Sequence, residues 1–594
     1  MAIQPGTWNK LPGNCTRSFT ITFLQCASWG VRNFKECLVG AWSWVEKCAE
    51  YGWTTVKNCS WWAFLGCLLW AIVAVFGCIL LQLVFVFTCF ILVVISWVFC
   101  LLWTFVSITF CLANRYGGTA FLLTDGTVMM QEWEISLFYE AQPTRRWWKL
   151  TPDRHGSYLN GSWSQLADSN LARGGFASSV LADGRVVVCG GEDTDASGSV
   201  TEDRNNSCEI YDPVANSWTK FDSPTLPGST EVWSMIGDAP CTLLPDGSLL
   251  LGSLADKNVA KLDPTTLTWT AMSQRPVVGD SSEDSWALMP DNTVVTPSCR
   301  AHQTTWIYQI ANDRWVRSND LPTDIIGAGD EIGPGLLLYD GRAIFLGGNE
   351  HSAIYNPAAG AAPWSNGPDL PLSITGQPLG ILDGPGALLV NGNLLFGAGV
   401  AQVDSAGNYS QPAWFFEFDG TGFFPTNSPP NSDCRTMDTR LLLLPDGDVM
   451  FCRQNDADFY AYRSPAVPGD RFRPVIQSCP TNIDPGTTIQ VSGTQFNGLS
   501  QAVGYGDDSQ TATNYPLVKL VNRANREVRF CRTHDHTTVD DSGATVISMG
   551  VATGSAVIVT NADVPADLAL GDYQLFVIAN GIASLPFDVA VGST

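Results

Sequence analysis

The sequence predicts a multidomain chain with a long N-terminal transmembrane α-helix, a seven-bladed β-propeller and a C-terminal β-sandwich. Three observations lead to this prediction. Cysteines recur every eleven residues in the first 111 positions, an uncharged run follows Lys57, and a turn motif recurs seven times between residues 123 and 447. We place the boundaries at 1–14 for an N-terminal tail, 15–114 for the helix, 115–468 for the propeller and 469–594 for the sandwich.

Ten cysteines mark the N-terminal repeat. Successive cysteines are eleven residues apart, except for one step of eight between Cys59 and Cys67. Eleven residues at about 100° each exceed three helical turns by only about 20°, so the thiols line one face of a helix. A hendecad repeat favours a right-handed coiled coil, so we expect this seam to pack against other copies of the chain. The seam residues are Cys15, Cys26, Cys37, Cys48, Cys59, Cys67, Cys78, Cys89, Cys100 and Cys111.

An uncharged run predicts a membrane segment within this helix. No charged residue lies between Lys57 and Arg115, and the interval is rich in Leu, Val, Phe, Ile and Trp. As one helix the run is about 85 Å long, against a hydrocarbon core of roughly 30 Å. A hairpin of two spans and one overlong helix inside an oligomer both stay open, and the unbroken cysteine phase over 78–111 favours the single helix. Basic residues precede the run, so a single span places the N-terminus in the cytoplasm and the propeller outside it.

Charge and cysteine content restrict the partners and the compartment. The chain has 33 Lys and Arg against 57 Asp and Glu, a net charge of −24. An acidic surface repels phosphate, so nucleic acid is excluded as a partner. Eight further cysteines follow the helix, an even number that suits disulfides in an oxidising compartment. The first pair that we expect is Cys479–Cys531, because both residues lie in the predicted sandwich.

A repeated turn predicts the propeller. An Asp-Gly or Asn-Gly pair between apolar strands is a strong hairpin signal, and seven copies spaced by 45 to 63 residues predict a propeller array. An aromatic pair, such as Tyr211 with Trp218, follows most of these turns. The turns lie at Asp125-Gly126, Asp183-Gly184, Asp246-Gly247, Asp291-Asn292, Asp340-Gly341, Asn391-Gly392 and Asp446-Gly447.

Short strands predict the C-terminal domain. Residues 488–492, 518–521, 556–559 and 573–577 have the composition of strands, and Pro485-Gly486 and Asn497-Gly498 mark turns. This pattern over about 125 residues is typical of an immunoglobulin-like β-sandwich.

Glycine pairs and aromatic pairs together resemble the kelch repeat. The double glycines are Gly190-Gly191 and Gly347-Gly348. A kelch propeller followed by an immunoglobulin-like domain is similar to the galactose oxidase and glyoxal oxidase superfamily, over roughly residues 116–592. Ala172-Arg173-Gly174 and Gly571–Phe576 match that superfamily well. The resemblance implies a copper ion held by two tyrosines and two histidines, with one tyrosine crosslinked to a cysteine.

The residues that this copper site requires are not retained in the sequence. Gly175 stands where the crosslinked tyrosine should follow Ala-Arg-Gly, and Met437 and Asp438 stand where a tyrosine and a histidine should. No cysteine lies at 114–118, where the crosslinking residue is expected, and only Thr533-His534 matches the last histidine. Copper needs several strong donors in a fixed geometry. We therefore predict no catalytic residue and no cofactor from the resemblance.

Two nearby histidines leave one candidate metal site. On a strand, His534 and His536 face the same side and could bind a metal with a third ligand from the propeller. The alternative is a pair of interface histidines that bind no metal. We place the candidate channel-mouth site at His534, His536, Asp438 and Arg173.

These features favour a membrane-anchored homo-oligomer with a noncatalytic binding or structural role at the cell surface. Its expected partners are copies of itself through 15–114, membrane lipid, and a protein or glycan bound by the propeller. Two alternatives stay open. One is an oxidoreductase or hydrolase with an altered site around His534, Asp438 and Arg173, and the other is an oligomeric transmembrane pore with the propeller as its vestibule.

Overall fold

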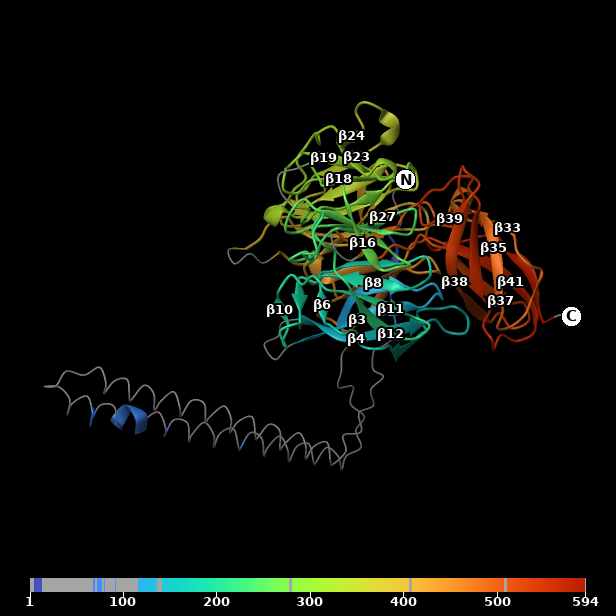
Figure 1. Cartoon of the computed structure of the whole chain (residues 1–594), viewed down its shortest axis with the longest axis horizontal. Coiled ribbons are helices and arrows are strands. Elements are labelled where there is room, and N and C mark those ends of the chain that lie inside the picture. Colours follow the sequence, from blue (N-terminus) through green and yellow to red (C-terminus); the bar gives the residue numbers. More distant parts are fainter. Residues whose placement is uncertain are drawn as a thin grey trace. The chain divides into compact units, whose positions relative to one another are not determined.

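The computed structural model describes residues 5–12, 68–69, 72–76, 80, 91, 116–135, 141–276, 280–404, 409–506 and 510–592. The chain divides into two compact units, Cys15–Ala113 and a larger unit formed by Met1–Asn14 with Asn114–Thr594. The larger unit consists of two β domains, a propeller and a C-terminal sandwich whose strands gather at the C-terminal end of the chain (Figure 1).

Seven sheets form the blades of the propeller, and each runs from an inner to an outer strand. Blade one consists of β2 (Tyr116–Leu122), β3 (Val128–Ile135), β4 (Ala141–Thr151) and β5 (Ser162–Gln165), and blade two of β7 (Ala177–Val180), β8 (Val186–Cys189), β11 (Cys208–Asp212) and β12 (Ser217–Phe221). Blade three consists of β13 (Cys241–Leu243), β14 (Leu249–Gly252), β15 (Val259–Asp263) and β16 (Thr268–Met272), and blade four of β17 (Ala287–Leu288), β18 (Thr293–Pro297), β19 (Thr305–Gln309) and β20 (Arg314–Arg317).

The last three blades complete the ring. Blade five consists of β21 (Ile332–Leu337), β22 (Ala343–Gly347), β23 (Ser352–Tyr355) and β24 (Trp364–Asn366). Blade six consists of β26 (Gly386–Leu388), β27 (Leu394–Val400), β28 (Trp414–Phe418) and β29 (Phe423–Pro425), with β25 (Leu379–Gly380) beside β27. Blade seven consists of β30 (Thr439–Leu443), β31 (Val449–Arg453), β32 (Tyr460–Arg463) and β1 (Thr7–Lys10). The inner strands of successive blades contact one another from β7 through β13, β17, β21 and β26 to β30, and β30 contacts β2.

Shorter elements lie between the blades. A small sheet follows the first blade, and single 3₁₀ turns punctuate the connections. They are β6 (Arg173–Gly174), β9 (Asp193–Thr194) and β10 (Thr201–Glu202), and η2 (Ile310–Asn312), η3 (Ala328–Asp330), η4 (Pro357–Ala359), η5 (Thr436–Asp438) and η6 (Asp470–Phe472).

The repeated sequence signature is the contact between neighbouring blades. The rings of Tyr308 and Trp315 lie 5.0 Å apart on paired strands. The indole N–H of Trp315 donates to the carbonyl of Ser273, which follows the previous blade, and Trp218 donates likewise to Ala167, both at 3.1 Å. In each of these blades, a tryptophan of the outer strand therefore contacts the preceding blade. Together with the seven sheets, this contact confirms the predicted propeller.

The N-terminal strand closes the ring. Residues 7–10, which we expected to form part of a tail, pair with β32 as the outer strand of the seventh blade. The ring of Trp8 lies 4.9 Å from that of Tyr462, and its indole N–H donates to the carbonyl of Asn427 at 2.6 Å. Trp8 thus makes the same contact in blade seven that Trp315 makes in blade four.

This closure corrects the predicted N-terminal helix. Residues 7–10 and 116–122 belong to one propeller, so the chain leaves this domain after β1 and returns to it at β2. A single span with the N-terminus and the propeller on opposite sides of a membrane is inconsistent with that pairing. Within the parts of the chain that the structure describes, no helix is long and apolar enough to cross a bilayer. The long transmembrane helix is therefore wrong as predicted, and the ten seam cysteines lie outside the described residues.

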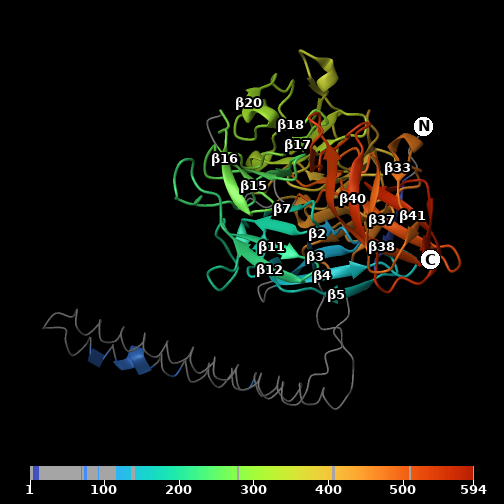
Figure 2. The same ribbon diagram turned by 45° about the vertical axis from the view of Figure 1, so that its right-hand side comes forward.

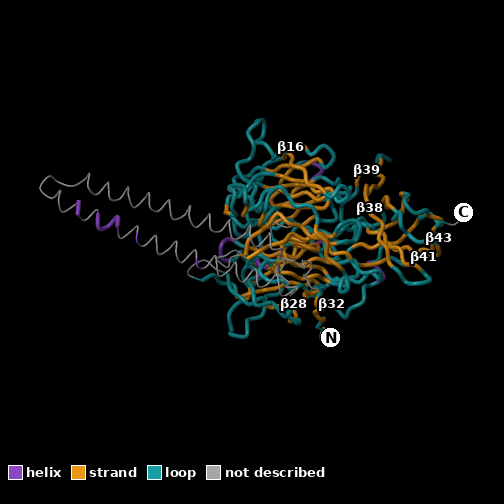
Figure 3. Tube along the Cα trace, turned by 90° about the horizontal axis from the view of Figure 1, so that it is seen from below, coloured by secondary structure: helices purple, strands orange, loops and turns teal. Residues whose placement is uncertain are grey.

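The C-terminal domain is a sandwich in which β38 belongs to both layers. Its core includes Val491, Val518 and Leu575, all fully buried. The strands cluster together in all three views (Figures 1, 2 and 3). They are β33 (Val475–Ser478), β34 (Asn482–Ile483), β35 (Thr488–Thr494), β37 (Leu517–Asn522), β38 (Val528–Val539), β39 (Thr545–Ile547), β40 (Ile558–Asp563), β41 (Gly571–Ala579), β42 (Ile582–Ala583) and β43 (Phe587–Val591).

The disulfide differs from the pair that we expected. Cys189 and Cys208 are bonded across the neighbouring strands β8 and β11 of the second blade, whereas Cys479 and Cys531 are free thiols. Both expected partners lie in the sandwich, but membership of one domain does not place two Cβ atoms within bonding distance.

The sandwich packs on the propeller face that carries the Asp-Gly turns. Backbone N–H groups of Thr533, Asp535 and Met549 donate to carbonyls in three of these turns, at 2.8 to 3.0 Å. The opposite ends of the inner strands, with the connections that precede them, form what we call the open face.

Candidate functional site

A loop of the sandwich fills the central channel. Its strand β36 (Val503–Gly504) pairs with β26 of the sixth blade. The Tyr505 hydroxyl donates to the carbonyl of Met437 at 2.6 Å, and the Arg440 guanidinium lies 4.1 Å from the centre of the Tyr505 ring. The space left beside Tyr505 and Arg440 is only about 10 Å³. The propeller is therefore plugged along its axis.

Three carboxylates meet on the open face. Glu283, Glu331 and Asp383 come from the connections that precede β17, β21 and β26, so three neighbouring blades each contribute one. Their ligand oxygens all lie within 4.8 Å of one another. The channel loop reaches the same place, since a Cβ on Gly506 would lie 3.3 Å from an Asp383 carboxylate oxygen. We call these three residues the carboxylate cluster.

Glu331 is the buried member of the cluster. It is 8 % exposed, and its Oε1 accepts a hydrogen bond from the Tyr409 hydroxyl at 2.7 Å. Its Oε2 is buried and accepts no hydrogen bond from the residues that the structure describes, although the Glu331 and Glu283 carboxyl groups lie close enough to share a proton. Burial, followed by the charge of Glu283, raises the pKa of Glu331 to about 9. A buried carboxyl group thus faces its neighbours without a compensating positive charge.

The arginines bonded to these loops pair with carboxylates outside the cluster. Arg275 forms a fully buried ion pair with Asp284, the residue after Glu283. Arg300 bridges Asp280 and Asp330 at 3.1 and 2.5 Å. These pairs fix the loops on which the cluster stands, but they supply it with no counter-charge.

Arg173 and Asp438, also on the open face, have separate structural partners. The Arg173 guanidinium lies 2.8 Å from Glu209, and both side chains are almost fully buried. Asp438 pairs with Arg435 at 2.6 Å. Phe176, in the segment where the resemblance calls for a tyrosine ligand, is fully buried in the core.

His534 and His536 lie on the sandwich rather than at the mouth of the channel. We expected both rings on one side of a strand, but β38 changes register against β40 between His534 and Thr537, and Asp535 has a left-handed φ of 53°. This bulge ends the alternation of side chains. The two rings consequently occupy different surroundings.

The partners of these histidines are also different. The His534 nitrogens face Asp535 at 2.6 Å and Asp563 at 3.3 Å. His536 is fully buried, and its Nδ1 lies 3.0 Å from the Thr560 hydroxyl. Burial lowers the pKa of His536 to about 3, so this ring is neutral at physiological pH. The four predicted residues therefore form no single site.

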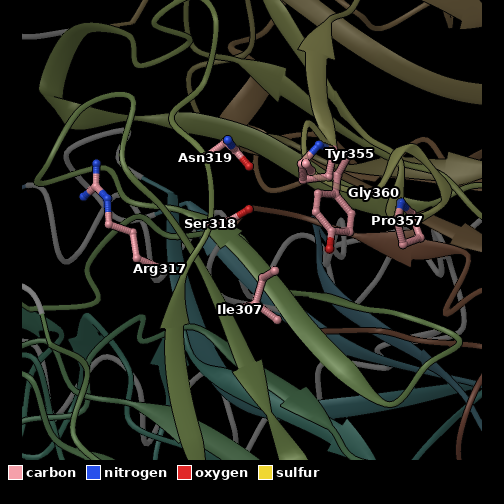
Figure 4. Close-up of a pocket in the computed structure, with 9 residues that line it drawn as sticks. Ile307, Arg317, Ser318, Asn319, Tyr355, Pro357 and Gly360 are labelled. Carbon is pink, nitrogen blue, oxygen red and sulfur yellow. The ribbon is translucent and has the colours of Figure 1, made fainter.

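A shallow groove lies at the outer edges of blades four and five. Its volume is about 390 Å³, and it is lined by polar side chains and by the turn after Tyr355. Ser318, Asn319 and Tyr355 lie around this groove (Figure 4). No titratable cluster lines it.

One comparison with known families agrees with the propeller architecture. The Kelch motif matches residues 173–225, which contain the second blade. No curated protein matches the chain. Among solved structures, the chain is similar to a novel fungal alcohol oxidase with catalytic diversity among the AA5 family, in complex with copper. The identity is 15 %, the TM-score is 0.37, and the match covers 80 % of this chain and 85 % of that one. A likeness of this strength assigns no activity.

Proposed function

We propose that this chain is a noncatalytic binding or structural propeller attached to a lipid membrane. The observation that carries the proposal is which residues stand at the positions where the resemblance calls for copper ligands, and what their side chains contact. Gly175 has no side-chain donor, its neighbour Phe176 offers none either, and the carboxylate of Asp438 is held by Arg435. A copper–radical site needs several free donors at one point.

Copper loading tests the noncatalytic role. The full-length protein is purified in detergent, dialysed against Cu²⁺ and then desalted. We expect far less than one tightly held copper per chain by elemental analysis, and no peroxide from alcohols, sugars or aldehydes. One equivalent of copper together with substrate-dependent peroxide would contradict the proposal.

Membrane attachment is supported by the uncharged run between Lys57 and Arg115. Within it, the described helical residues Leu69, Ile72 and Phe76 are exposed to solvent. Large apolar side chains that face outward in this number suit a lipid environment. The pairing of β1 with β32 requires the segment to begin and end at the same propeller.

The proposed attachment therefore has a defined topology. We expect a tag placed before Thr7 and a tag after Val591 to lie on the same side of a sealed membrane. The disulfide between Cys189 and Cys208 supports the oxidising, extracytoplasmic side. Accessibility of the two tags to protease or to an impermeant reagent shows on which side of the membrane each tag lies. Tags on opposite sides would contradict it.

Replacement of residues 15–113 tests attachment directly. Connections of fourteen residues, 273–286 and 318–331, join other neighbouring blades. A Gly/Ser linker that restores such a length between β1 and β2 is expected to release the protein from carbonate-washed membranes. Measuring the mass of the wild-type protein and of the replacement variant in detergent tests self-association through 15–114, which stays a prediction.

The propeller is the proposed binding domain, for a protein or a glycan. The acidic composition favours basic protein surfaces over acidic ones. The pore alternative gains no support, because Tyr505 and its loop fill the channel that would serve as vestibule. Protein and glycan arrays probed with the full chain in detergent test the ligand class. No saturable binder in either array would leave the structural role as the function.

A further inference from the structure

We propose that Glu283, Glu331 and Asp383 form a site for one hard divalent cation, with Ca²⁺ as the preferred ion. The site lies on the open face, on blades four to six, and none of its three residues stands at a position where the resemblance calls for a copper ligand. It is independent of the membrane attachment and of the binding role proposed above.

The donor set selects the class of metal. The three residues offer carboxylate oxygens only, and the Tyr409 hydroxyl lies next to them on Glu331. Hard cations such as Ca²⁺, Mg²⁺ and Mn²⁺ prefer oxygen ligands, whereas copper and zinc prefer nitrogen or sulfur. An oxygen-only set with no histidine or thiolate therefore favours the hard ions.

The spacing allows one ion to contact all three carboxylates, and the geometry of the ion then decides between Ca²⁺ and Mg²⁺. The ligand oxygens lie within 4.8 Å of one another, and Ca²⁺ binds oxygen at about 2.3–2.6 Å in a flexible geometry. Two oxygens on opposite sides of Ca²⁺ are about 5 Å apart, so oxygens within this bound can belong to one coordination shell. Mg²⁺ has shorter bonds, near 2.1 Å, and demands stricter octahedral geometry.

Glu331 provides the second, independent indication of a ligand. Its carboxyl group is buried to more than nine-tenths, it faces Glu283, and Oε2 accepts no hydrogen bond within the described part of the chain. A buried polar atom without a partner is costly, and native structures rarely leave one. A cation between Glu331 and its two neighbours would satisfy this oxygen and neutralise the mutual repulsion.

The surrounding ion pairs make the site preorganised. Arg275 with Asp284 anchors the loop of Glu283, and Arg300 joins that loop to the one before Glu331. Neither guanidinium is bonded to the cluster in these pairs. These ion pairs hold the loops of Glu283 and Glu331 in place before an ion binds.

Calcium titration of the full-length protein in detergent tests the proposal. After treatment with a chelator, the protein is titrated with Ca²⁺, Mg²⁺ or Zn²⁺ in 150 mM KCl, by calorimetry and by thermal unfolding. We expect one saturable Ca²⁺ per chain, a higher Tm with Ca²⁺, and weaker binding of Mg²⁺ and Zn²⁺. Absence of a saturable site overturns the proposal.

Matched variants locate the ion. Glu283→Gln and Asp383→Asn each remove one charge without changing the size of the side chain, and each is expected to weaken Ca²⁺ binding at least about tenfold. The control is Asp291→Asn, an exposed turn residue of the same fourth blade, which should bind as the wild type does. Equal affinity in all variants would place the ion elsewhere and overturn the assignment.

A shared proton is the rival occupant of the cluster. If Glu331 and Glu283 are joined by a proton alone, Glu331→Gln folds normally and neither it nor the wild type responds to Ca²⁺. That result overturns the proposal. A response in the wild type that is lost in Glu331→Gln supports it, and copper content, which tests the noncatalytic role, is unaffected in either case.

Discussion

The open face has two sides that differ in how their acidic and basic side chains are paired. On blades two and seven, Arg173 and Asp438 each have an oppositely charged partner within 2.8 Å. On blades four to six, the carboxylate cluster brings three carboxyl groups together. Both sets precede the inner strands of their blades, so the same position in the repeat serves both arrangements.

The difference distinguishes charged groups that stabilise the fold from charged groups that can bind a ligand. A buried ion pair whose hydrogen bonds are satisfied has little affinity left for an added ion. Crowded carboxylates raise the free energy of the unliganded protein, and an ion that binds them lowers it. We therefore expect mutations on the two sides to affect stability with different magnitude and different sign.

The largest expected effect is at Arg173. Arg173→Met leaves Glu209 buried without its cation, so we expect a loss of about 3–5 kcal/mol in the free energy of unfolding. Glu283→Gln on the other side removes a repulsion, so in chelator it should change stability by less than about 0.5 kcal/mol or increase it. Urea unfolding of the full chain measures both.

The double variant Arg173→Met with Glu209→Gln provides the control. It removes both charges of the pair and should recover part of the loss. Equal destabilisation by Arg173→Met and Glu283→Gln would show that the two sides of the open face do not differ.

The propeller was predictable because each blade carries its signals locally. In the first turn, the Asp125 carboxylate accepts from the backbone N–H of Thr127 at 3.0 Å, and Gly126 has a φ of 75°. Such a turn is encoded by adjacent residues and needs no information from the rest of the chain.

Ring closure was missed because its two strands are 450 residues apart. Thr7-Trp8-Asn9-Lys10 resembles Ser217-Trp218-Thr219-Lys220 of the second blade, and this likeness was an available signal. The seventh blade also lacks an aromatic outer strand after Arg463 in the sequence. The cysteine repeat gave a local periodicity, but only the pairing of β1 shows that the chain must return.

The carboxylate cluster was missed for a related reason. Its members are about fifty residues apart, and the order of the blades alone brings them together. The signal was weak but present, because Glu331 and Asp383 each precede a Gly-Pro-Gly run that begins an inner strand. The expectation that His534 and His536 face the same side of a strand failed because no local pattern revealed the bulge at Asp535.

The pH dependence of stability should also distinguish the two sides. In chelator, the folded protein keeps Glu331 protonated until about pH 9, whereas the unfolded chain releases that proton near pH 4.5. The folded state therefore binds more protons between these values, and the free energy of unfolding falls as pH rises across this window, by at most about 1.4 kcal/mol per pH unit.

Glu331→Gln should remove this slope. The measurement is the difference between wild-type and Glu331→Gln unfolding free energies at several pH values, with the double variant Arg173→Met and Glu209→Gln as the control that retains the wild-type slope. If the wild-type and Glu331→Gln curves ran parallel, the crowding of carboxylates would have no energetic consequence.

The smallest expected effect is at Arg435. Arg435→Gln removes the cation from Asp438, but the Arg435 side chain is 38 % exposed, so water compensates for part of the lost attraction. The backbone N–H of residue 435 still lies 3.3 Å from the Asp438 carboxylate. We therefore expect a loss of about 1 kcal/mol or less in urea unfolding.

Arg435→Gln also tests whether the two sides act independently. Because Arg435 pairs with Asp438 on blade seven, its removal should leave Ca²⁺ affinity at the carboxylate cluster unchanged. A loss as large as that of Arg173→Met would mean that exposure does not moderate the ion pairs of blades two and seven. A change in Ca²⁺ affinity would mean that both sides belong to one electrostatic system, in which the charges that hold the fold also set the charge available to a ligand.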